Sequence, residues 1–216
     1  MARMSSAPRA RVGRPRALPA ETDSSPRDQI LDAAAALFVD NGFAGTTTRA
    51  IAERVGIRQA SMYYHFAGKD DILLELLRRT VRPTLDVLGE LDTLDPAASL
   101  YALVVRDVET LVRAPHNIGT LYLLPEVAHE RFEEFWADRT ELRSAYSRLG
   151  TATATDEVRA ALTPDQLGVL LIHTAESVIS ARRDGVAYDG EQIAAACLRL
   201  CGLGADDIAA AATVLD

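Results

Sequence analysis

The sequence predicts an all-α protein in which a small N-terminal helical domain is followed by a larger helical body. Apolar residues recur three and four positions apart from residue 26 onward, which is the period of an amphipathic helix. Prolines and glycines interrupt this pattern where helices should end. From about residue 83 onward no segment alternates as a strand would. We therefore expect three parts, at residues 1–25, 26–82 and 83–216.

Residues 1–25 have the composition of a linker, with prolines, serines and arginines that no acidic residue opposes before Glu21. Such a segment cannot bury enough apolar surface to offset the entropy lost on ordering, so we expect disorder. Within it, Gly13-Arg14-Pro15-Arg16 resembles the core of an AT-hook, whose arginines enter a narrow A·T minor groove. Arg14 and Arg16 are therefore candidate minor-groove residues. The alternative is a general cationic tail.

The first helix is predicted to begin at Ser25-Pro26, because serine is a good cap and proline suits the first turn. It should end near Asn41-Gly42. Its apolar stripe consists of Ile30, Leu31, Ala34, Leu37 and Phe38. We expect this helix to support the two short helices that follow.

Two short helices joined by a glycine are predicted between Thr48 and Phe66. The first ends at Gly56, a position where a left-handed residue commonly closes a helix. The second begins at about Gln59, and its Met62 can pack inward together with Phe66. This arrangement is a helix-turn-helix, whose second helix lies in the major groove of DNA.

The remaining side chains of this segment suit contact with a duplex. Gln59 can pair with an adenine edge, and Ser61 can bond to almost any base. Lys69 is the only lysine in the chain and opens the next helix, where free backbone amides favour an anion such as phosphate. We predict base contacts for Arg49, Gln59, Ser61 and Tyr63, phosphate contacts for Thr48, Tyr64, His65 and Lys69, and further DNA contacts for Thr47 and Arg58.

Charge is distributed unevenly along the chain. Residues 1–82 hold 13 basic and 9 acidic side chains, a net charge of +4. Residues 83–216 hold 10 basic and 22 acidic side chains, a net charge of -12, which leaves -8 for the whole chain. This asymmetry suggests a part that faces nucleic acid, joined to an acidic body that avoids phosphate.

Several features between Arg27 and Leu77 recur together in one known family. They are the amphipathic helix before the motif, Phe43, Thr46-Thr47-Thr48-Arg49, Ala52-Glu53, Val55-Gly56-Ile57, Ser61-Met62-Tyr63-Tyr64-His65-Phe66 and Lys69. In these residues the chain resembles the tetracycline-repressor (TetR) family of bacterial transcription regulators. In one respect the pattern departs from that family: Arg58 stands where many members carry a capping serine, and arginine is a poor cap.

A fourth helix is predicted to begin near Lys69 and to run on to about Leu91. Pro83 falls inside this pattern, and a proline within a helix removes a hydrogen bond and bends the axis. We therefore expect one helix with a kink where the DNA-binding part meets the body.

The body should contain several longer helices. We expect one helix from Asp95-Pro96 to Pro115, a short apolar piece at 117–124, and one from Pro125 to about Leu149. Thr163-Pro164-Asp165-Gln166 has the spacing of a capping box, so a helix should begin there and run to about Arg183. This helix is apolar nearly all round from Leu167 to Ile179, so it must be covered on every side. A partner subunit is the expected second cover, together with a helix at about 190–200. The family resemblance implies a homodimer whose interface is built from two such late helices of each subunit.

Several aromatic and polar residues of the body are candidates for binding a small molecule, because pockets are mostly apolar with a few convergent polar groups. For any single aromatic residue a place in the core is the stronger alternative. For His173 and Glu176 the alternative is a polar pair at the dimer interface. The candidate ligand-binding residues are Tyr101, Tyr122, His129, Phe132, Trp136, His173 and Glu176.

Other chemistry finds little support in the sequence. Glu126 and His129 have the spacing of half a di-metal carboxylate site, but no second such motif exists, so no metal is expected. Cys197 and Cys201 are expected to be buried hydrophobes. There is no serine-nucleophile elbow, phosphate loop or zinc-protease motif, so we expect neither an enzyme nor a cofactor.

These observations together predict an all-α, homodimeric, ligand-responsive repressor that binds double-stranded operator DNA. The resemblance implies that a small-molecule effector enters the acidic body, shifts the kinked fourth helix and releases DNA. The alternatives are an architectural DNA-binding protein without a ligand and, more remotely, an all-α enzyme. No membrane span or secretory signal is evident, and two cysteines are too few for a disulfide framework, so we expect a cytoplasmic protein.

Overall fold

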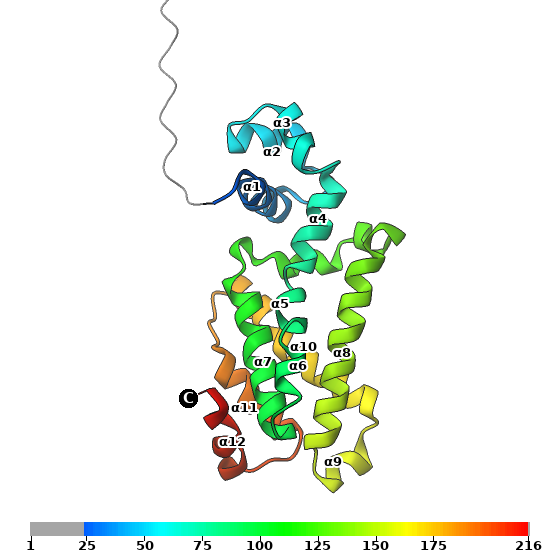
Figure 1. Ribbon diagram of the computed structural model, residues 1–216, viewed down its shortest axis with the longest axis vertical. Helices are drawn as coiled ribbons and strands as arrows, with labels where there is room; N and C mark the ends of the chain where they lie inside the picture. The colour runs from blue at the N-terminus through cyan, green and yellow to red at the C-terminus, as the bar shows by residue number, and fades with distance from the viewer. Residues whose placement is uncertain (1–23, 216) are drawn as a thin grey trace, which may run out of the picture.

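The computed structural model describes residues 24–215, which are helical and contain no strand. The first four helices form a unit at one end of the molecule, which we call the head (Figure 1). Its apolar core joins all four helices and includes Phe38, Ile51, Met62 and Leu73, all of them essentially inaccessible to water. The head consists of α1 (Pro26–Asn41), α2 (Thr48–Val55), α3 (Gln59–His65) and α4 (Lys69–Arg78).

The rest of the described chain, from Arg82 onward, forms the body, in which the long helices run roughly along the long axis of the molecule (Figure 1). In it α10 packs along α8, and α11 packs along α7. Two short helices, α9 and α12, which the sequence pattern does not predict, lie at the end away from the head. The body helices are α7 (Pro96–Arg113), α8 (Glu133–Thr153), α9 (Asp156–Ala161), α10 (Pro164–Arg183), α11 (Gly190–Leu200) and α12 (Ala205–Ala212).

The helix starts predicted from capping residues are confirmed. The Ser25 hydroxyl accepts a hydrogen bond from the Asp28 amide (3.1 Å) at the start of α1. Asp95 accepts from the amides of α7, and Thr163 forms a capping box with Gln166 at the start of α10. Each cap satisfies amides that the first helical turn leaves without partners, which is why these boundaries can be found locally.

The prediction of a single fourth helix with a kink at Pro83 is wrong in one respect, because the helix ends before the proline. The helix α4 ends at Arg78, and two single turns follow, α5 (Arg82–Leu85) and α6 (Leu88–Leu91). Pro83 has no amide hydrogen to donate to the Arg79 carbonyl, and its ring crowds that carbonyl. The regular series of helical hydrogen bonds therefore ends one turn before the proline. We call residues 79–81 the joint.

The predicted helix from Pro125 to about Leu149 begins later, at Glu133. Before it the chain makes three short 3₁₀ segments, η1 (Pro115–Leu123), η2 (Pro125–Ala128) and η3 (Glu130–Phe132). His129 is extended, and its Nδ1 accepts the Arg131 amide (3.2 Å), which starts a new turn there. Local capping therefore overrides the helical spacing of this segment.

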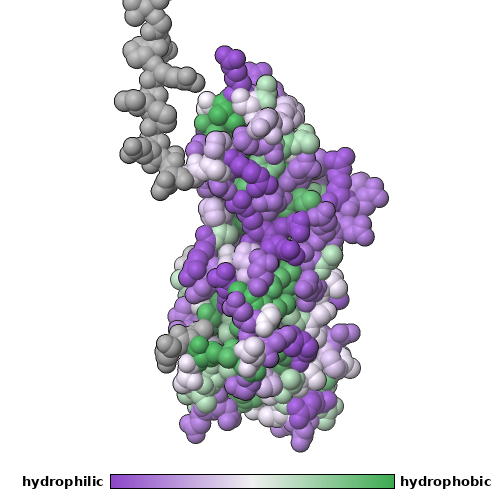
Figure 2. Space-filling view, in the orientation of Figure 1, coloured by the Kyte–Doolittle hydropathy of each residue, from purple (hydrophilic) through white to green (hydrophobic). Residues whose placement is uncertain are grey.

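The 3₁₀ segments fill the space between head and body. The helix α1 packs on η1, and α4 packs on both η1 and η3. Polar contacts span the boundary: His116 Nε2 lies 3.1 Å from Asp32 Oδ1, Arg131 pairs with Asp70 at 3.1 Å, and Arg78 on α4 pairs with Glu134 and, at 2.9 Å, with Asp138 on α8. Figure 2 shows hydrophilic residues dominating this boundary, with apolar residues on the body beneath it. Among residues 24–215 no helix combines the length and hydrophobicity of a membrane span.

Candidate DNA-binding surface and effector cavity

The helix α3 lies at the tip of the head, and its position follows from the turn before it (Figure 1). Gly56 adopts a left-handed conformation (φ 80°, ψ 24°), which an L side chain rarely takes. The next amide, of Ile57, donates back to the Ala52 carbonyl at 3.0 Å and closes α2. Met62 then anchors α3 in the core, so the opposite face of α3 points to solvent.

Polar side chains on this face are already connected by hydrogen bonds. Gln59 Nε2 donates to Thr48 Oγ1 (2.9 Å), which lies 3.3 Å from the Tyr63 hydroxyl. Tyr64, the most exposed of the aromatic side chains here at 88% accessibility, stands edge-on to His65. The structure thus brings predicted contact residues of both helices onto one exposed surface. We call Thr48, Gln59, Ser61, Tyr63 and Tyr64 the recognition surface.

The other predicted contacts lie around this surface. Thr47 caps α2, and its Oγ1 accepts the Ala50 amide at 3.1 Å. Arg49 is exposed and pairs with Glu53 one turn later (2.8 Å). Arg58 precedes α3 without a side-chain capping bond, yet the helix still begins at Gln59. Arg14 and Arg16 lie outside the described residues.

Lys69 has a structural role that sequence reasoning missed. Its Nζ donates to the carbonyls of Phe43 (2.8 Å) and Thr46 (3.1 Å) and lies 4.3 Å from the centre of the Phe43 ring. The ammonium group therefore joins the start of α4 to the loop between α1 and α2. One of its three donors remains for the predicted phosphate contact.

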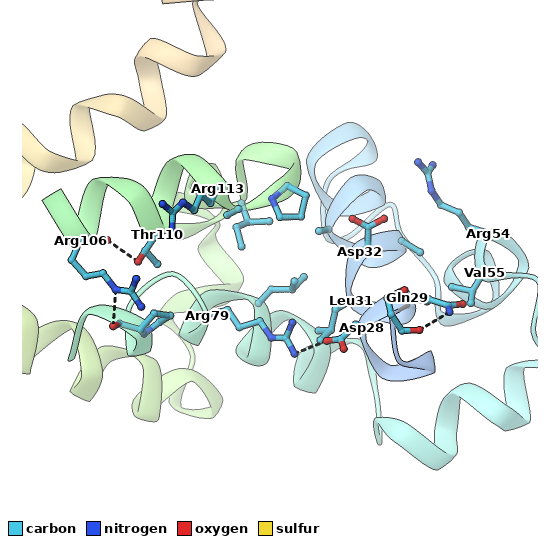
Figure 3. A pocket seen from close by; sticks show the side chains of 18 residues that line it. Asp28, Gln29, Leu31, Asp32, Arg54, Val55, Arg79, Arg106, Thr110 and Arg113 are labelled. Atoms are coloured by element: carbon cyan, nitrogen blue, oxygen red, sulfur yellow. Dashed lines mark hydrogen bonds and ion pairs between the residues drawn. The ribbon is translucent and has the colours of Figure 1, made fainter. Parts of the chain in front are cut away.

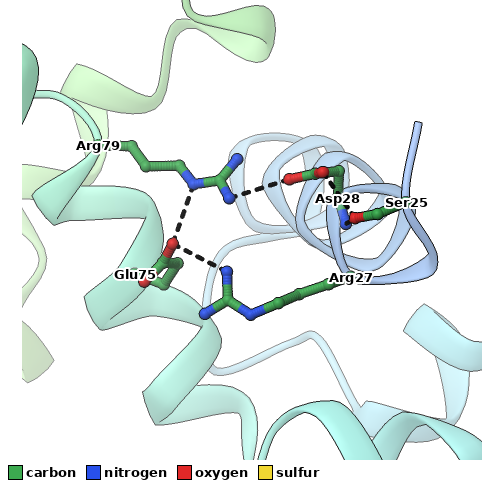
Figure 4. A network of polar contacts seen from close by, with 5 residues as sticks. All are labelled: Ser25, Arg27, Asp28, Glu75 and Arg79. Atoms are coloured by element: carbon green, nitrogen blue, oxygen red, sulfur yellow. Dashed lines mark hydrogen bonds and ion pairs between the residues drawn. The ribbon is translucent and has the colours of Figure 1, made fainter. Parts of the chain in front are cut away.

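A network of ion pairs joins α1 to α4 (Figure 4). Glu75 on α4 accepts hydrogen bonds from Arg27 and Arg79, both at 3.0 Å, and Arg79 also pairs with Asp28 at 2.9 Å. The hydrogen bond from Arg27 is the main reason that the pKa of Glu75 lies below its ordinary value. The network links the last turn of α4, next to the joint, to the first turn of α1.

A cavity of about 370 Å³ lies in the body between η1, α8 and α10. It contains four of the seven predicted ligand-binding residues, Tyr122, Trp136, His173 and Glu176. Because they come from three segments far apart in the sequence, only the packing of α10 on α8 and η1 brings them together. This space is a candidate site for an effector, and we call it the effector cavity; its wall also includes Leu123 and Arg139.

Arg139 is the residue of this cavity that sequence reasoning missed. It forms a hydrogen-bonded ion pair with Glu176, and the two side chains are only 17% and 16% exposed. Its guanidinium carbon lies 4.7 Å from the centre of the Tyr122 ring. The Tyr122 hydroxyl donates to Thr80 Oγ1 in the joint, and burial raises the pKa of this tyrosine. The position of Arg139, one turn after Trp136 on α8, was the available signal.

The other three predicted ligand-binding residues lie elsewhere. Tyr101 is buried on α7, and burial, with help from the nearby Glu191 and Asp189, raises its pKa. Phe132 is in the core at 1% exposure. His129 is exposed and caps η3. None of these three side chains lines the effector cavity.

A larger cleft of about 800 Å³ separates α1 from α7 beside the joint, and no sequence pattern pointed to it (Figure 3). Its wall mixes apolar groups such as Leu31 and Ile118 with charged ones. Figure 3 shows that Arg79 points toward Asp28. The Nε of Arg106 donates to the carbonyl of Pro83, which follows the joint, at 3.3 Å.

A buried carboxyl group lies between α7 and α5. Asp107 is 1% exposed, accepts a hydrogen bond from the Tyr146 hydroxyl at 2.8 Å, and lies 3.4 Å from Thr84 Oγ1. Burial raises its pKa to about 7. This carboxyl is therefore half-protonated near neutral pH and ties the turn after the joint to the core of the body.

The cysteines are buried, as predicted, and the thiol of Cys197 points to the Leu171 carbonyl at 3.7 Å. Burial raises the pKa of Cys197 to about 12 and that of Cys201 to about 11, which keeps both as unreactive thiols. Within residues 24–215 no three His, Cys, Asp or Glu side chains are grouped as metal ligands would be, and this holds for the surroundings of Glu126 and His129.

The fold and this surface define a two-part helical protein of the helix-turn-helix class. Residues 30–76 match the profile of the bacterial regulatory proteins of the tetR family. The structure of AmtR from Mycobacterium smegmatis superposes with a TM-score of 0.79 at 40% identity, over 90% of this chain and 95% of AmtR. The chain belongs to the tetR family.

Two further relatives are similar to this chain over less of its sequence or at lower identity. The repressor KstR2 of Rhodococcus jostii is 34% identical over 128 residues, which is 57% of this chain. The aligned region spans 62% of the length of KstR2, so the likeness does not extend over the whole of that relative. AibR, solved with isovaleryl coenzyme A and operator DNA, has the same fold, with a TM-score of 0.63 at 17% identity over 80% of this chain and 95% of AibR.

Proposed function

We propose that this protein is a homodimeric transcriptional repressor that binds a near-palindromic operator and is released by a small molecule. The observation that carries the proposal is the recognition surface at the tip of the head. Its side chains are exposed, polar and pre-ordered by the hydrogen bonds among Gln59, Thr48 and Tyr63. Side chains held in this way lose little entropy on meeting base edges and phosphates.

In this proposal, two copies pair through α10 and α11 of the body. The two helices pack against each other and leave Leu170 (44% exposed) and Leu200 (40% exposed) facing solvent. One recognition helix makes few base contacts, whereas two on a dyad can reach successive turns of DNA about 34–36 Å apart. The division of labour is a DNA-binding part at residues 26–82 and an effector-binding and dimerisation part at 83–216.

The effector site in this proposal is the cavity that contains Tyr122, Trp136, His173 and Glu176. It adjoins the joint through the Tyr122–Thr80 hydrogen bond, so a ligand there can act on α4. By linkage, the ligand must bind more tightly to the conformation that does not bind DNA. AibR offers a precedent, since that protein of the same fold has been solved with both isovaleryl coenzyme A and operator DNA. We place the protein in the bacterial cytoplasm, where its operator lies.

The test is selection of bound sequences from random double-stranded oligonucleotides with the full chain. We expect a near-palindrome with two half-sites one helical turn apart. Tyr64→Ala should weaken binding to the selected site, whereas Tyr188→Phe, on the body, should not. Binding without sequence preference would favour the architectural alternative. A stable monomer without DNA affinity would contradict the proposal and reopen the enzyme hypothesis.

A further inference from the structure

The effector cavity has a charge that opposes that of the body around it. Residues 83–216 carry a net charge of -12, yet the cavity wall contains two arginines, Arg139 and Arg183, and one carboxylate, Glu176. Arg183 is exposed at the mouth and pairs with Asp184 at 3.3 Å. The wall thus brings two guanidinium groups, each paired with one carboxylate, into a body that as a whole repels anions.

Arg139 has the geometry to hold such an anion. A guanidinium has five N–H donors in a rigid fork, and within residues 24–215 the hydrogen bonds of Arg139 go to Glu176 alone. Further donors therefore remain for a second carboxylate or phosphate, and partial burial makes charge-assisted bonds stronger than they would be in water. The ligand does not need to displace Glu176 to bind.

The rest of the wall favours a ligand with an apolar part. Leu123 is 91% exposed and Trp136 is 40% exposed, and both lie on the cavity. Tyr122 and Ile179, both partly buried, add apolar surface to the wall. Covering these side chains removes apolar area from water, which favours binding. The cavity volume of about 370 Å³ suits a small molecule rather than a peptide.

A chain of contacts leads from Arg139 to the joint. The guanidinium stacks on the Tyr122 ring, and the Tyr122 hydroxyl donates to Thr80 Oγ1. Thr80 is 1% exposed and its own hydroxyl donates to the Leu77 carbonyl, in the last turn of α4, at 2.6 Å. Each hydroxyl thus has one acceptor, and the series ends on the helix that carries the head.

We propose that the effector is an organic anion with an aromatic or aliphatic body, held by Arg139, and that Tyr122 relays its binding to Thr80 in the joint. When the guanidinium turns toward the ligand it leaves the Tyr122 ring, the ring moves, and the hydrogen bond to Thr80 is lost. The end of α4 is then free to change its angle to the body. This inference rests on the proposed function, since it assumes that the cavity is the effector site.

The first experiment measures binding to the full chain by titration calorimetry. The probes are phenylacetate, 3-phenylpropionate and octanoate, each compared with its uncharged amide. We expect at least one carboxylate to bind about 10-fold or more tightly than its amide, as expected for a charge-assisted hydrogen bond. Equal affinities of each acid and its amide, or no binding of any carboxylate at millimolar concentration, would overturn the anion assignment.

Two variants locate the binding site. Arg139→Gln should remove the preference for the carboxylate, and the double variant Arg139→Gln/Glu176→Gln should do the same without leaving one buried charge unpaired. Arg106→Gln is the matched control, because it removes an arginine from the cleft between head and body instead. If the preference for the carboxylate over its amide is kept in Arg139→Gln but lost in Arg106→Gln, the anion binds in the cleft and the proposal is overturned.

The second experiment tests the relay with the carboxylate that binds best and the selected operator. Tyr122→Phe keeps the ring and removes only the hydroxyl, so it should still bind the anion. Because the bond to Thr80 is then absent from the start, its operator affinity should already be lowered without the anion, and the anion should lower it little further. Tyr188→Phe should behave as the unmodified protein. Operator affinity and release in Tyr122→Phe that equal those of the unmodified protein, or an anion that binds the unmodified protein without weakening its operator affinity, would overturn the relay. Failure of the unmodified chain to bind any operator would instead contradict the proposed function. The calorimetric result on anion binding would not be affected.

Discussion

The head and the body of this protein use ionic groups in opposite ways. On the head, Arg49 and Glu53 form an ion pair with side chains 78% and 64% exposed, beside the recognition surface. In the body, Arg139 and Glu176 form an ion pair with side chains 17% and 16% exposed, in the wall of a cavity. Water screens the first pair and only weakly screens the second. Arg49 therefore stays available for a partner, whereas Arg139 is coupled to the fold.

The buried groups of the body should dominate its response to pH. The folded-state pKa of Asp107 is raised to about 7 from an ordinary 3.8, so the stability it contributes is complete below pH 4 and is lost as pH rises to 7. Asp107→Asn should abolish this loss, which amounts to about 4 kcal/mol at 1.36 kcal/mol per pKa unit. Urea unfolding of both proteins between pH 4 and 8 measures it. Parallel pH profiles would show that Asp107 is not coupled to folding.

Removing one partner of the ion pair between Arg139 and Glu176 should have the next largest effect on stability. Arg139→Ala leaves Glu176 in the cavity wall without its cation and removes the stacking on Tyr122. We expect a loss of about 3 kcal/mol in the free energy of unfolding, as for other enclosed pairs. Chemical denaturation is the measurement, and Arg183→Ala, at the exposed mouth, is the control. A loss of less than about 1 kcal/mol would mean that water screens this pair as it does the pairs of the head.

A change on the recognition surface should alter DNA binding rather than stability. Gln59→Ala removes a group bonded only to Thr48 on the surface, so the midpoint of thermal unfolding should stay nearly constant. Operator affinity should fall by about 1–3 kcal/mol per half-site, with relaxed preference at one base pair. Competition binding with operators mutated at single positions tests this. An affinity loss that is the same for every sequence would identify Gln59 as a phosphate contact.

The exposed ion pair of the head should give the smallest effect on stability. Arg49→Ala breaks a pair within one helix that is largely in water, and about 0.5 kcal/mol or less should be lost. The same variant should weaken operator binding if Arg49 contacts a base, as the sequence predicts. Denaturation and binding measured side by side separate the two roles. A stability loss close to that of Arg139→Ala would remove the contrast between head and body.

The recognition surface of the head was easier to predict from the sequence than the cavity of the body. The recognition surface could be foreseen because its residues lie within one short stretch, from Thr48 to Tyr64, and a single glycine fixes the turn between its helices. Of the cavity, Tyr122, Trp136, His173 and Glu176 were foreseen as residue types, but Arg139 was not. A charged residue on an amphipathic helix looks solvent-exposed in sequence, and only packing encloses it.

By itself the sequence determined the helical class, the starts of α1, α7, α10 and α11, and the helix-turn-helix. Caps, glycines and apolar periodicity act within a few residues, so they can be recognised along the chain. Only the tertiary structure decided that Lys69 binds two carbonyls, that Arg139 lies on the Tyr122 ring, and that Tyr122 bonds to Thr80 at the joint. Those outcomes depend on which buried polar groups find partners across the fold, and such partners lie dozens of residues away.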